Sequence, residues 1–337
     1  MSGTDAPRYL LDLRGRQADF GAWVVGIAFC RETGAPGFGL GDGTLRIGLD
    51  GAVLQVHRGA VLSVAADCAR GFLTGGDDGK LCTSSDGLTT VLADYGRRWV
   101  EHVAAHPEGL RVAASGRMLH LLDGQGVALK SLPHPSTVAG VAIDAKGKRV
   151  AASHYGGASI WFAAAREDKP RRLEWKGSHG AILFSPDGTH VITAMQENAL
   201  HGWRLSDGQH MRMTGYPAKT KSMCFTAKGR WLATSGADGI VLWPFFGGGP
   251  MGKAPTEIAG GDGVLCTQVA CHPEHEVVAA GFADGLVLVA EIASGKILPV
   301  APPGRGGVSA LAWHPQGHLL AFGTEEGFAA VVDFSPR

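Results

Sequence analysis

One short pattern recurs eight times along this chain, and it constrains the fold more than any other feature. Each copy is an apolar run that ends in a tight turn, and the clearest copy is Ala181-Ile182-Leu183-Phe184-Ser185-Pro186-Asp187-Gly188. The last core residues of the eight runs are Phe29, Ala66, Ala105, Ile143, Phe184, Phe225, Cys271 and Trp313. Their spacing of about forty residues, with about four short strand patterns in each period, is typical of a β-propeller.

The composition fits a single closed ring of short strands. The 337 residues include 51 glycines and only 18% are charged, as expected for a turn-rich protein with buried strands. A repeat that runs from end to end predicts one domain over residues 1–337, since each blade buries its faces against its neighbours. The net charge is zero, so no long-range field attracts nucleic acid or an anionic membrane. We therefore expect neither as a partner.

The N-terminal segment and the cysteines favour a cytoplasmic protein. Residues 1–17 are interrupted by charges and lack the apolar stretch of an export signal. No run of 18 apolar residues is long enough to span a membrane. The six cysteines, at positions 30, 68, 82, 224, 266 and 271, follow no disulfide-framework spacing. We expect reduced thiols, no cofactor and a monomer.

The sixth repeat serves as a template for the blade. Its predicted strands, innermost first, cover residues 221–225, 231–234, 240–243 and 256–258. The Asp238-Gly239 turn between the second and third strands supplies the positive φ that a hairpin needs.

The eighth repeat has room for only three strands, because three residues follow its third strand at 329–334. We expect the N-terminal segment 8–13 to supply the fourth strand and close the ring, which removes exposed sheet edges.

Two motifs carry a resemblance to a known family. Phe184-Ser185-Pro186-Asp187-Gly188 is a strand-turn phrase, and Ser235-Gly236-Ala237-Asp238-Gly239-Ile240-Val241-Leu242-Trp243 runs from the second turn to a third-strand tryptophan. Trp161 and Trp203 hold the same third-strand position in their repeats. In these motifs the chain resembles the WD40 repeat family over essentially its whole length. The resemblance implies a propeller of four-stranded blades that binds proteins and has no catalytic role.

The repeats also depart from that family's pattern. No Trp-Asp dipeptide occurs and no Gly-His pair precedes the first strands, so the family's Asp-His-Ser-Trp hydrogen-bond network is not expected whole. In repeat six, Asp238, Ser235 and Trp243 could supply three of its members. Eight first-strand phrases predict eight four-stranded blades, and seven, the commoner ring in the family, is the alternative.

Other motifs suggest chemistry but fail on context or spacing. Residues 247–254 nearly match a phosphate-binding loop, yet Ala254 stands where Ser or Thr must hold Mg²⁺. Cys266 and Cys271 lie about 16 Å apart along one strand, which is too far for a single zinc. The alternative to protein binding is a metal or small-ligand site in the channel or at histidine-bearing turns, with the ligands His272, His275, His314 and His318. No catalytic triad converges in the repeat, so we expect no enzyme.

Two segments are candidates for binding a partner protein, because arginine and aromatic residues dominate binding hot spots. The first leads into repeat three and contains Tyr95, Arg97, Arg98 and Trp99, with His154 and Tyr155 of repeat four as a possible extension. The alternative is that Trp99 packs inward between blades. The second is a loop in repeat six with Phe245, Phe246 and Met251, which either docks a partner or folds back onto its blade. The sequence thus predicts a non-enzymatic protein-interaction scaffold.

Overall fold

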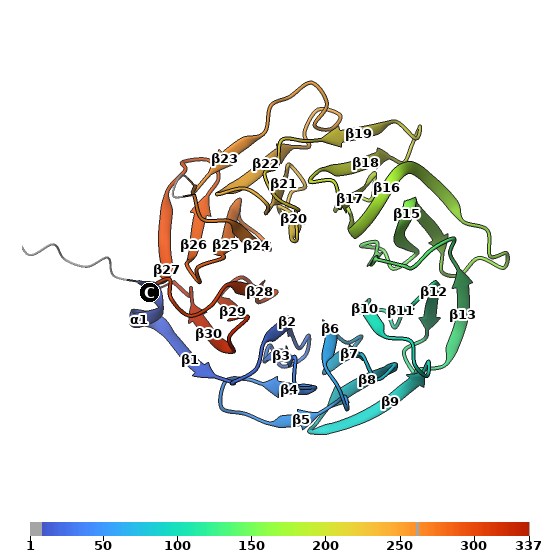
Figure 1. The fold of residues 1–337 in the computed structure, drawn as a ribbon, viewed down its shortest axis with the longest axis horizontal. Coiled ribbons are helices and arrows are strands. Elements are labelled where there is room, and N and C mark those ends of the chain that lie inside the picture. The colour runs from blue at the N-terminus through green and yellow to red at the C-terminus, as the bar shows by residue number, and fades with distance from the viewer. Residues whose placement is uncertain (1–8, 261–262, 337) are drawn as a thin grey trace, which may run out of the picture.

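A computed structural model describes residues 9–260 and 263–336 as a closed ring of antiparallel sheets around a central axis (Figure 1). Each repeat contributes four strand positions, from the axis outward. Inner strands are β2 (Val24–Phe29), β6 (Val61–Ala66), β10 (Val100–Ala105), β14 (Gly140–Ile143), β20 (Met223–Phe225), β24 (Cys266–Cys271) and β28 (Val308–Trp313). Second strands are β3 (Pro36–Leu40), β7 (Phe72–Gly76), β11 (Arg111–Ser115), β17 (His190–Met195), β21 (Trp231–Thr234), β25 (Val277–Phe282) and β29 (Leu319–Thr324).

The remaining strands complete the blades. Third strands are β4 (Thr44–Ile47), β8 (Lys80–Ser85), β12 (Met118–Leu122), β18 (Leu200–Arg204), β22 (Ile240–Pro244), β26 (Val287–Glu291) and β30 (Phe328–Asp333). Outer strands are β5 (Val53–Gln55), β9 (Leu88–Asp94), β13 (Ala128–Pro133), β19 (His210–Met213), β23 (Thr256–Ile258), β27 (Ile297–Ala301) and β1 (Gly15–Asp19). Repeats four and five share two long strands, β15 (Arg149–Phe162) and β16 (Arg171–Phe184).

Hydrogen bonding groups these strands into seven sheets, six with four strands and one with six. The six-stranded sheet holds repeats four and five, because β15 and β16 each run through two strand positions. β14 pairs with residues 150–153 of β15, residues 155–160 of β15 pair with the start of β16, and the end of β16 pairs with β17. When each sheet of the described residues is counted as one blade, the ring has seven blades, and one of them contains two repeats. Seven blades was the alternative to the eight that the sequence predicted. The all-β closed propeller is confirmed.

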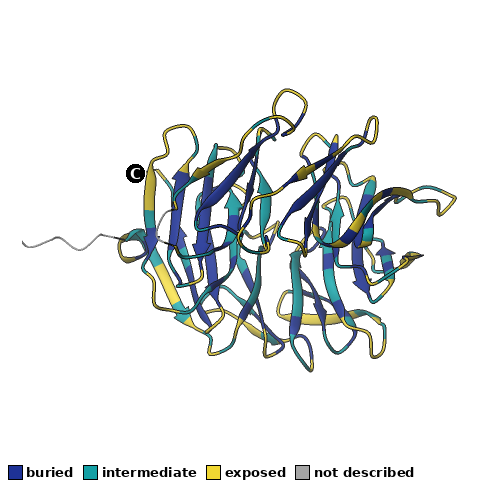
Figure 2. Cartoon of the chain, turned by 45° about the horizontal axis from the view of Figure 1, so that its top comes forward, coloured by how far each residue is buried: buried dark blue, intermediate teal, exposed yellow. Residues whose placement is uncertain are grey.

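Apolar side chains pack between neighbouring repeats rather than in one central core. In one cluster Val112 of repeat three contacts the group around Val150 and Trp161 of repeat four, and similar clusters join the other neighbours. Burying one such Val or Leu side chain contributes about 1.5–3 kcal/mol. Figure 2 shows the consequence: most strand residues are buried or intermediate, and the exposed residues lie mainly in the loops on both faces and on the outer strands.

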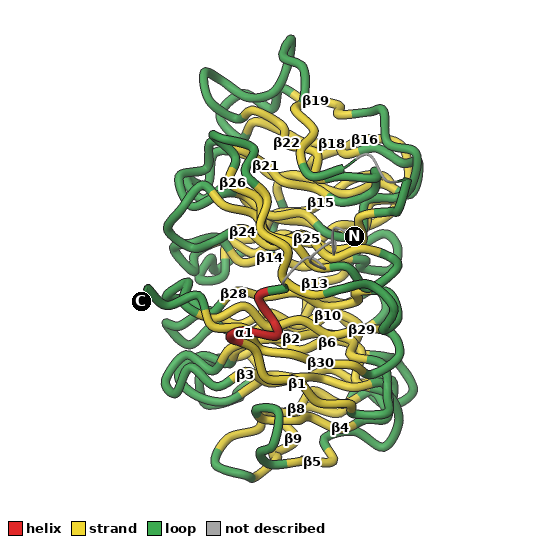
Figure 3. The backbone as a smooth tube through the Cα atoms, turned by 90° about the vertical axis from the view of Figure 1, so that its left-hand side faces the viewer, coloured by secondary structure: helices red, strands yellow, loops and turns green. Residues whose placement is uncertain are grey.

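The ring is closed by an N-terminal strand, as expected, but the strand lies further along the chain than segment 8–13. β1 pairs antiparallel with β30, from Gly15 opposite Val332 to Asp19 opposite Phe328. Residues Leu10–Arg14 form the short helix α1 instead, which Figure 3 shows at the outer edge of the ring beside β1. Leu11 is buried there among residues that include Val300. An outer strand is largely exposed, so it needs no apolar pattern. The apolar residues Leu10 and Leu11 pack in this cluster as part of α1, whereas Leu13 is exposed. Position 8 lies outside the described residues.

Removing residues 1–19 is expected to lower the melting temperature and to produce soluble oligomers or aggregates, because it leaves the hydrogen-bonding edge of β30 unpaired. Thermal unfolding and size-exclusion chromatography measure both effects. The matched control removes residues 1–8 only and keeps α1 and β1. A 1–19 deletion that stays monomeric with an unchanged melting temperature would contradict the assigned closure.

Candidate functional site

The loops that lead into the inner strands and the second turns of the repeats lie on one face of the ring, here called the top face. The Gly41 amide donates to the Trp23 carbonyl oxygen at 2.9 Å, and the Asp77 amide donates to that of Ala60 at 3.2 Å. The Ser115 hydroxyl donates to the Arg98 carbonyl oxygen at 3.2 Å. In each case the chain just before an inner strand contacts the second turn of the same repeat. The opposite, bottom face therefore carries the first turns.

Trp99 stands at the top face with 55% of its surface exposed, so it does not pack inward between blades. The next residue, Val100, is fully buried at the start of β10. Trp23 holds the equivalent position before β2 and is 52% exposed. Since β6 packs between β2 and β10, the two tryptophans flank repeat two. The sequence analysis missed Trp23, although the shared Trp-Val step before an inner strand was a usable signal.

Two arginines beside Trp99 are exposed and carry uncompensated charge. Among the described residues, neither Arg97 nor Arg98 forms an ion pair. Arg98 and Arg117 line a pocket of about 430 Å³ whose other walls include Met118 and Pro133. Exposed guanidinium groups next to a flat aromatic ring suit recognition of carboxylates and planar groups.

The other residues of the predicted patch differ in exposure. Tyr95 is half-buried, its ring stacks on His120 at 4.1 Å, and burial raises the pKa of its hydroxyl to about 12. His154 is buried, with Nδ1 2.9 Å from the Tyr155 carbonyl oxygen and Nε2 3.0 Å from the Ser159 hydroxyl. Tyr155 itself is 61% exposed. Of these three residues, Tyr155 is therefore the one whose side chain is open to a partner, whereas Tyr95 packs against His120 and His154 is hydrogen-bonded within its own repeat.

The loop of repeat six is folded back onto its blade over most of its length. Phe245 is buried and packs edge-on against Phe225 at 4.8 Å. Phe246 is 41% exposed and contacts Trp231, while the Lys253 ammonium lies over its ring at 4.8 Å. Met251 remains exposed. Lys253 also donates to the Gly249 carbonyl oxygen at 2.9 Å. The lysine of the stretch that resembles a phosphate-binding loop is thus bonded within its own loop.

The histidine-bearing turns do not converge on a metal site. Nδ1 of His272 accepts hydrogen bonds from the amides of Glu274 and His275, both at 3.1 Å, and Nε2 lies 3.2 Å from the Gly317 carbonyl oxygen. Nδ1 of His314 accepts from the Gln316 amide at 3.1 Å, and His318 packs against the His314 ring at 4.1 Å. Within residues 9–260 and 263–336, no group of three or more His, Cys, Asp or Glu side chains is placed to hold a metal. The imidazoles of His272 and His314 instead form hydrogen bonds with the backbone of turns.

Known proteins resemble this chain in sequence and in fold. Residues 269–336 match the family described as the anaphase-promoting complex subunit 4 WD40 domain. Telomerase protein component 1 of Mus musculus is 27% identical over 202 residues, which make up 58% of this chain but only 7% of that protein. Together with the closed β-propeller, these matches support a protein of the WD40 repeat family. The crystal structure of the computationally designed Ika8 protein matches with a TM-score of 0.74 and 19% identity, covering 94% of this chain and 98% of the designed one. At that identity the match shows a shared fold only.

In this propeller, local hydrogen-bond variants stand where regular WD40 blades have an Asp-His-Ser-Trp network. In repeat two His57 contacts Asp78 and Thr74, each at 3.0 Å. In repeat six the Trp243 indole donates to the Tyr216 hydroxyl at 2.7 Å, and that hydroxyl lies 2.6 Å from Thr234. The prediction that Asp238 and Ser235 would join Trp243 was therefore wrong. In both repeats the central residue of these contacts, His57 or Tyr216, lies in the loop before the inner strand and does not belong to a Gly-His pair.

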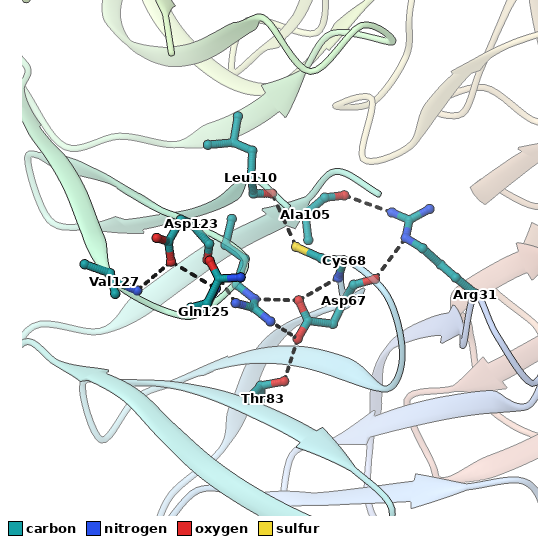
Figure 4. Close-up of polar contacts among 10 residues, drawn as sticks. Arg31, Asp67, Cys68, Thr83, Ala105, Leu110, Asp123, Gln125 and Val127 are labelled. Carbon is teal, nitrogen blue, oxygen red and sulfur yellow. Dashed lines mark hydrogen bonds and ion pairs between the residues drawn. The ribbon is translucent and has the colours of Figure 1, made fainter. Parts of the chain in front are cut away.

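A buried ion pair joins repeats two and three on the bottom face (Figure 4). The Asp67 carboxylate accepts two hydrogen bonds from Arg111, at 2.6 and 2.9 Å, and one from the Thr83 hydroxyl at 2.5 Å. Although burial opposes ionisation, these bonds hold the pKa of Asp67 below its usual value. Arg31 adds a bridge to the carbonyl oxygens of Asp67 and Ala105. Every oxygen of Asp67 is occupied, so the cluster serves packing rather than catalysis.

Over the described residues, no helix is long and apolar enough to cross a membrane.

Proposed function

We propose that this chain is a non-enzymatic platform that binds a partner protein through the top face, around Arg97, Arg98 and Trp99. The observation that carries the proposal is the pair of half-exposed tryptophans at equivalent positions, Trp23 and Trp99. Trp99 directly follows Arg97 and Arg98, which form no ion pair with any residue that the structure describes. Aromatic and arginine anchors of this kind supply most of the free energy in protein interfaces. The ring is closed and rigid, so little conformational entropy is lost when it docks. A cytoplasmic location and a monomeric state stay predictions.

The names of the similar proteins point the same way. One match is a "subunit" of the anaphase-promoting complex and the other is a "protein component" of telomerase. Both names describe parts of larger assemblies, and we infer that this chain also acts as a component of one. The exposed arginines favour a partner surface that presents carboxylates near an apolar or aromatic group. Tyr155 then contributes at the edge of the interface.

The double variant Arg97→Ala with Trp99→Ala is expected to weaken partner binding by at least tenfold without lowering the melting temperature, since both side chains are exposed. Proteins captured from a lysate of the source organism by the wild type and by the variant are compared by mass spectrometry, and the affinity for a differentially captured protein is then measured. The matched control is Phe246→Ala with Met251→Ala on the bottom face. Capture that is lost with the control and kept with the top-face variant would overturn the proposal.

A further inference from the structure

Two cysteines from neighbouring repeats meet near the axis of the ring. Cys224 lies in β20 and Cys271 ends β24, and their Sγ atoms are 2.8 Å apart. The Cys271 thiol also lies 3.5 Å from the Cys224 carbonyl oxygen. All six cysteines are free thiols. Three of the others contact a backbone carbonyl oxygen instead, namely Cys68, Cys82 and Cys266.

We propose that Cys224 and Cys271 are a dithiol site that peroxides oxidise to a disulfide, which covalently joins the inner strands of repeats six and seven. A disulfide bond is about 2.05 Å long, so the sulfur atoms need to approach by less than about 1 Å. Inner strands of adjacent repeats are already packed against each other at β20 and β24. The bond therefore requires a change in side-chain torsion and no rearrangement of the ring.

The surroundings give the two thiols different roles. Both residues are half-buried, whereas the other four cysteines are buried. Burial raises the pKa of the Cys271 thiol, and contact with Cys224 adds to this effect. Cys271 is therefore the less reactive thiol toward peroxide, since the thiolate is the nucleophile. We therefore assign the first attack on peroxide to Cys224 and the resolving step to Cys271.

The reaction balances with peroxide as the oxidant. The Cys224 thiolate attacks one oxygen of hydrogen peroxide, the O–O bond breaks, and sulfenic acid and hydroxide are formed. The Cys271 sulfur then attacks the sulfenyl sulfur, the S–O bond breaks, and the departing hydroxide takes the Cys271 proton to leave as water. The leaving hydroxide of the first step is likewise neutralised by a proton, so two thiols and one peroxide give one disulfide and two waters.

The disulfide would fasten the inner strand of repeat six, which is short. β20 has only three residues, whereas β24 has six, so few backbone hydrogen bonds hold the inner strand of repeat six. The disulfide encloses a long loop, because the two cysteines are 47 positions apart. Closing a loop of that length restricts the unfolded chain and raises the melting temperature by roughly 2–6 °C.

Mass spectrometry of the intact chain tests the proposal. The protein is exposed to hydrogen peroxide, free thiols are blocked with N-ethylmaleimide, and peptides are mapped without reduction. The expected product is a linked pair of peptides that contains Cys224 and Cys271, with the other four cysteines alkylated. A reductant should reverse both the link and the rise in melting temperature. In Cys224→Ser and Cys271→Ser the rise disappears, while Cys82→Ser, a buried thiol away from the pair, keeps it.

Two outcomes overturn the proposal. One is that both cysteines of the oxidised wild type are recovered as separate alkylated peptides. The other is that Cys224 is recovered as sulfinic or sulfonic acid with no linked peptide, which shows that Cys271 cannot reach it in time. The wild-type map alone decides between these results, so the test does not depend on the folding of any variant.

Discussion

Asp67→Ala is expected to lower the free energy of unfolding by about 3–5 kcal/mol, because it leaves the Arg111 guanidinium buried without its counter-charge. After the change, Arg111 retains one side-chain hydrogen bond, to the Asp123 carbonyl oxygen at 3.0 Å. The Thr83 hydroxyl and the Cys68 amide lose their acceptor as well. Urea unfolding at neutral pH, followed by tryptophan fluorescence, gives the free energy directly.

Two variants separate the buried charge from a general loss of packing. Asp67→Leu combined with Arg111→Met removes both charges, and it is expected to cost less than Asp67→Ala alone. Asp207→Ala breaks an ion pair with Arg204 on the surface and is expected to have a much smaller effect, since solvent screens exposed pairs. A loss for Asp67→Ala no larger than that for Asp207→Ala would show that the buried pair contributes little.

Most of the fold could be predicted from the sequence, because inner strands and hairpin turns need local residue types. The second and outer strands predicted for repeat six, residues 231–234 and 256–258, match β21 and β23 residue for residue. The closing strand was misplaced because an outer strand is exposed on one side and carries no apolar signal. Residues 15–19 read Gly-Arg-Gln-Ala-Asp, and only their pairing with β30 makes them a strand. Such pairing is a long-range property that a local pattern does not contain.

The candidate site was predictable only in part, for a related reason. The residue types in the segment around Arg97 and Trp99 suggested a binding surface, but their exposure depends on how three neighbouring repeats pack. Trp23 belongs to the same surface and lies 76 positions before Trp99 along the chain. The Cys224–Cys271 contact likewise joins two different repeats, six and seven. In a propeller, contacts between side chains of neighbouring blades depend on how one repeat is aligned with the next. The sequence reveals such contacts only after the repeats have been superposed.

Lowering the pH from 7 toward 4 is expected to destabilise the ring well before its carboxylates are protonated. Burial lowers the pKa of several histidines, to about 4 at His134 and to about 3 at His201. Burial holds His134 neutral, and its Nε2 accepts a hydrogen bond from the Trp161 indole at 3.1 Å. The unfolded chain takes up these protons near pH 6.5, whereas the folded chain does not. The stabilisation is therefore complete above about pH 6.5 and is lost progressively as the pH falls toward the folded pKa values.

Substitution of His201 gives the most direct test of this loss of stability at low pH. It is fully buried, and its ring stacks on Trp175 at 4.1 Å. Neither ring nitrogen has a hydrogen-bond partner among the residues that the structure describes. The Arg212 guanidinium opposes its protonation further, as do His179 and His210 whenever they carry a proton. Each unit of pKa depression corresponds to about 1.4 kcal/mol, so His201 alone accounts for a loss on the order of 4 kcal/mol by pH 3.

His201→Phe keeps the stacked ring and removes both unpaired nitrogens. The variant is expected to be more stable than the wild type by about 1–3 kcal/mol at pH 7, and to lose less stability between pH 7 and pH 4. The free energy of unfolding in urea, measured at half-unit steps over this range, gives both quantities. Identical profiles for His201→Phe and the wild type would mean that His201 is already paired or solvated, and that the acid sensitivity arises elsewhere in the ring.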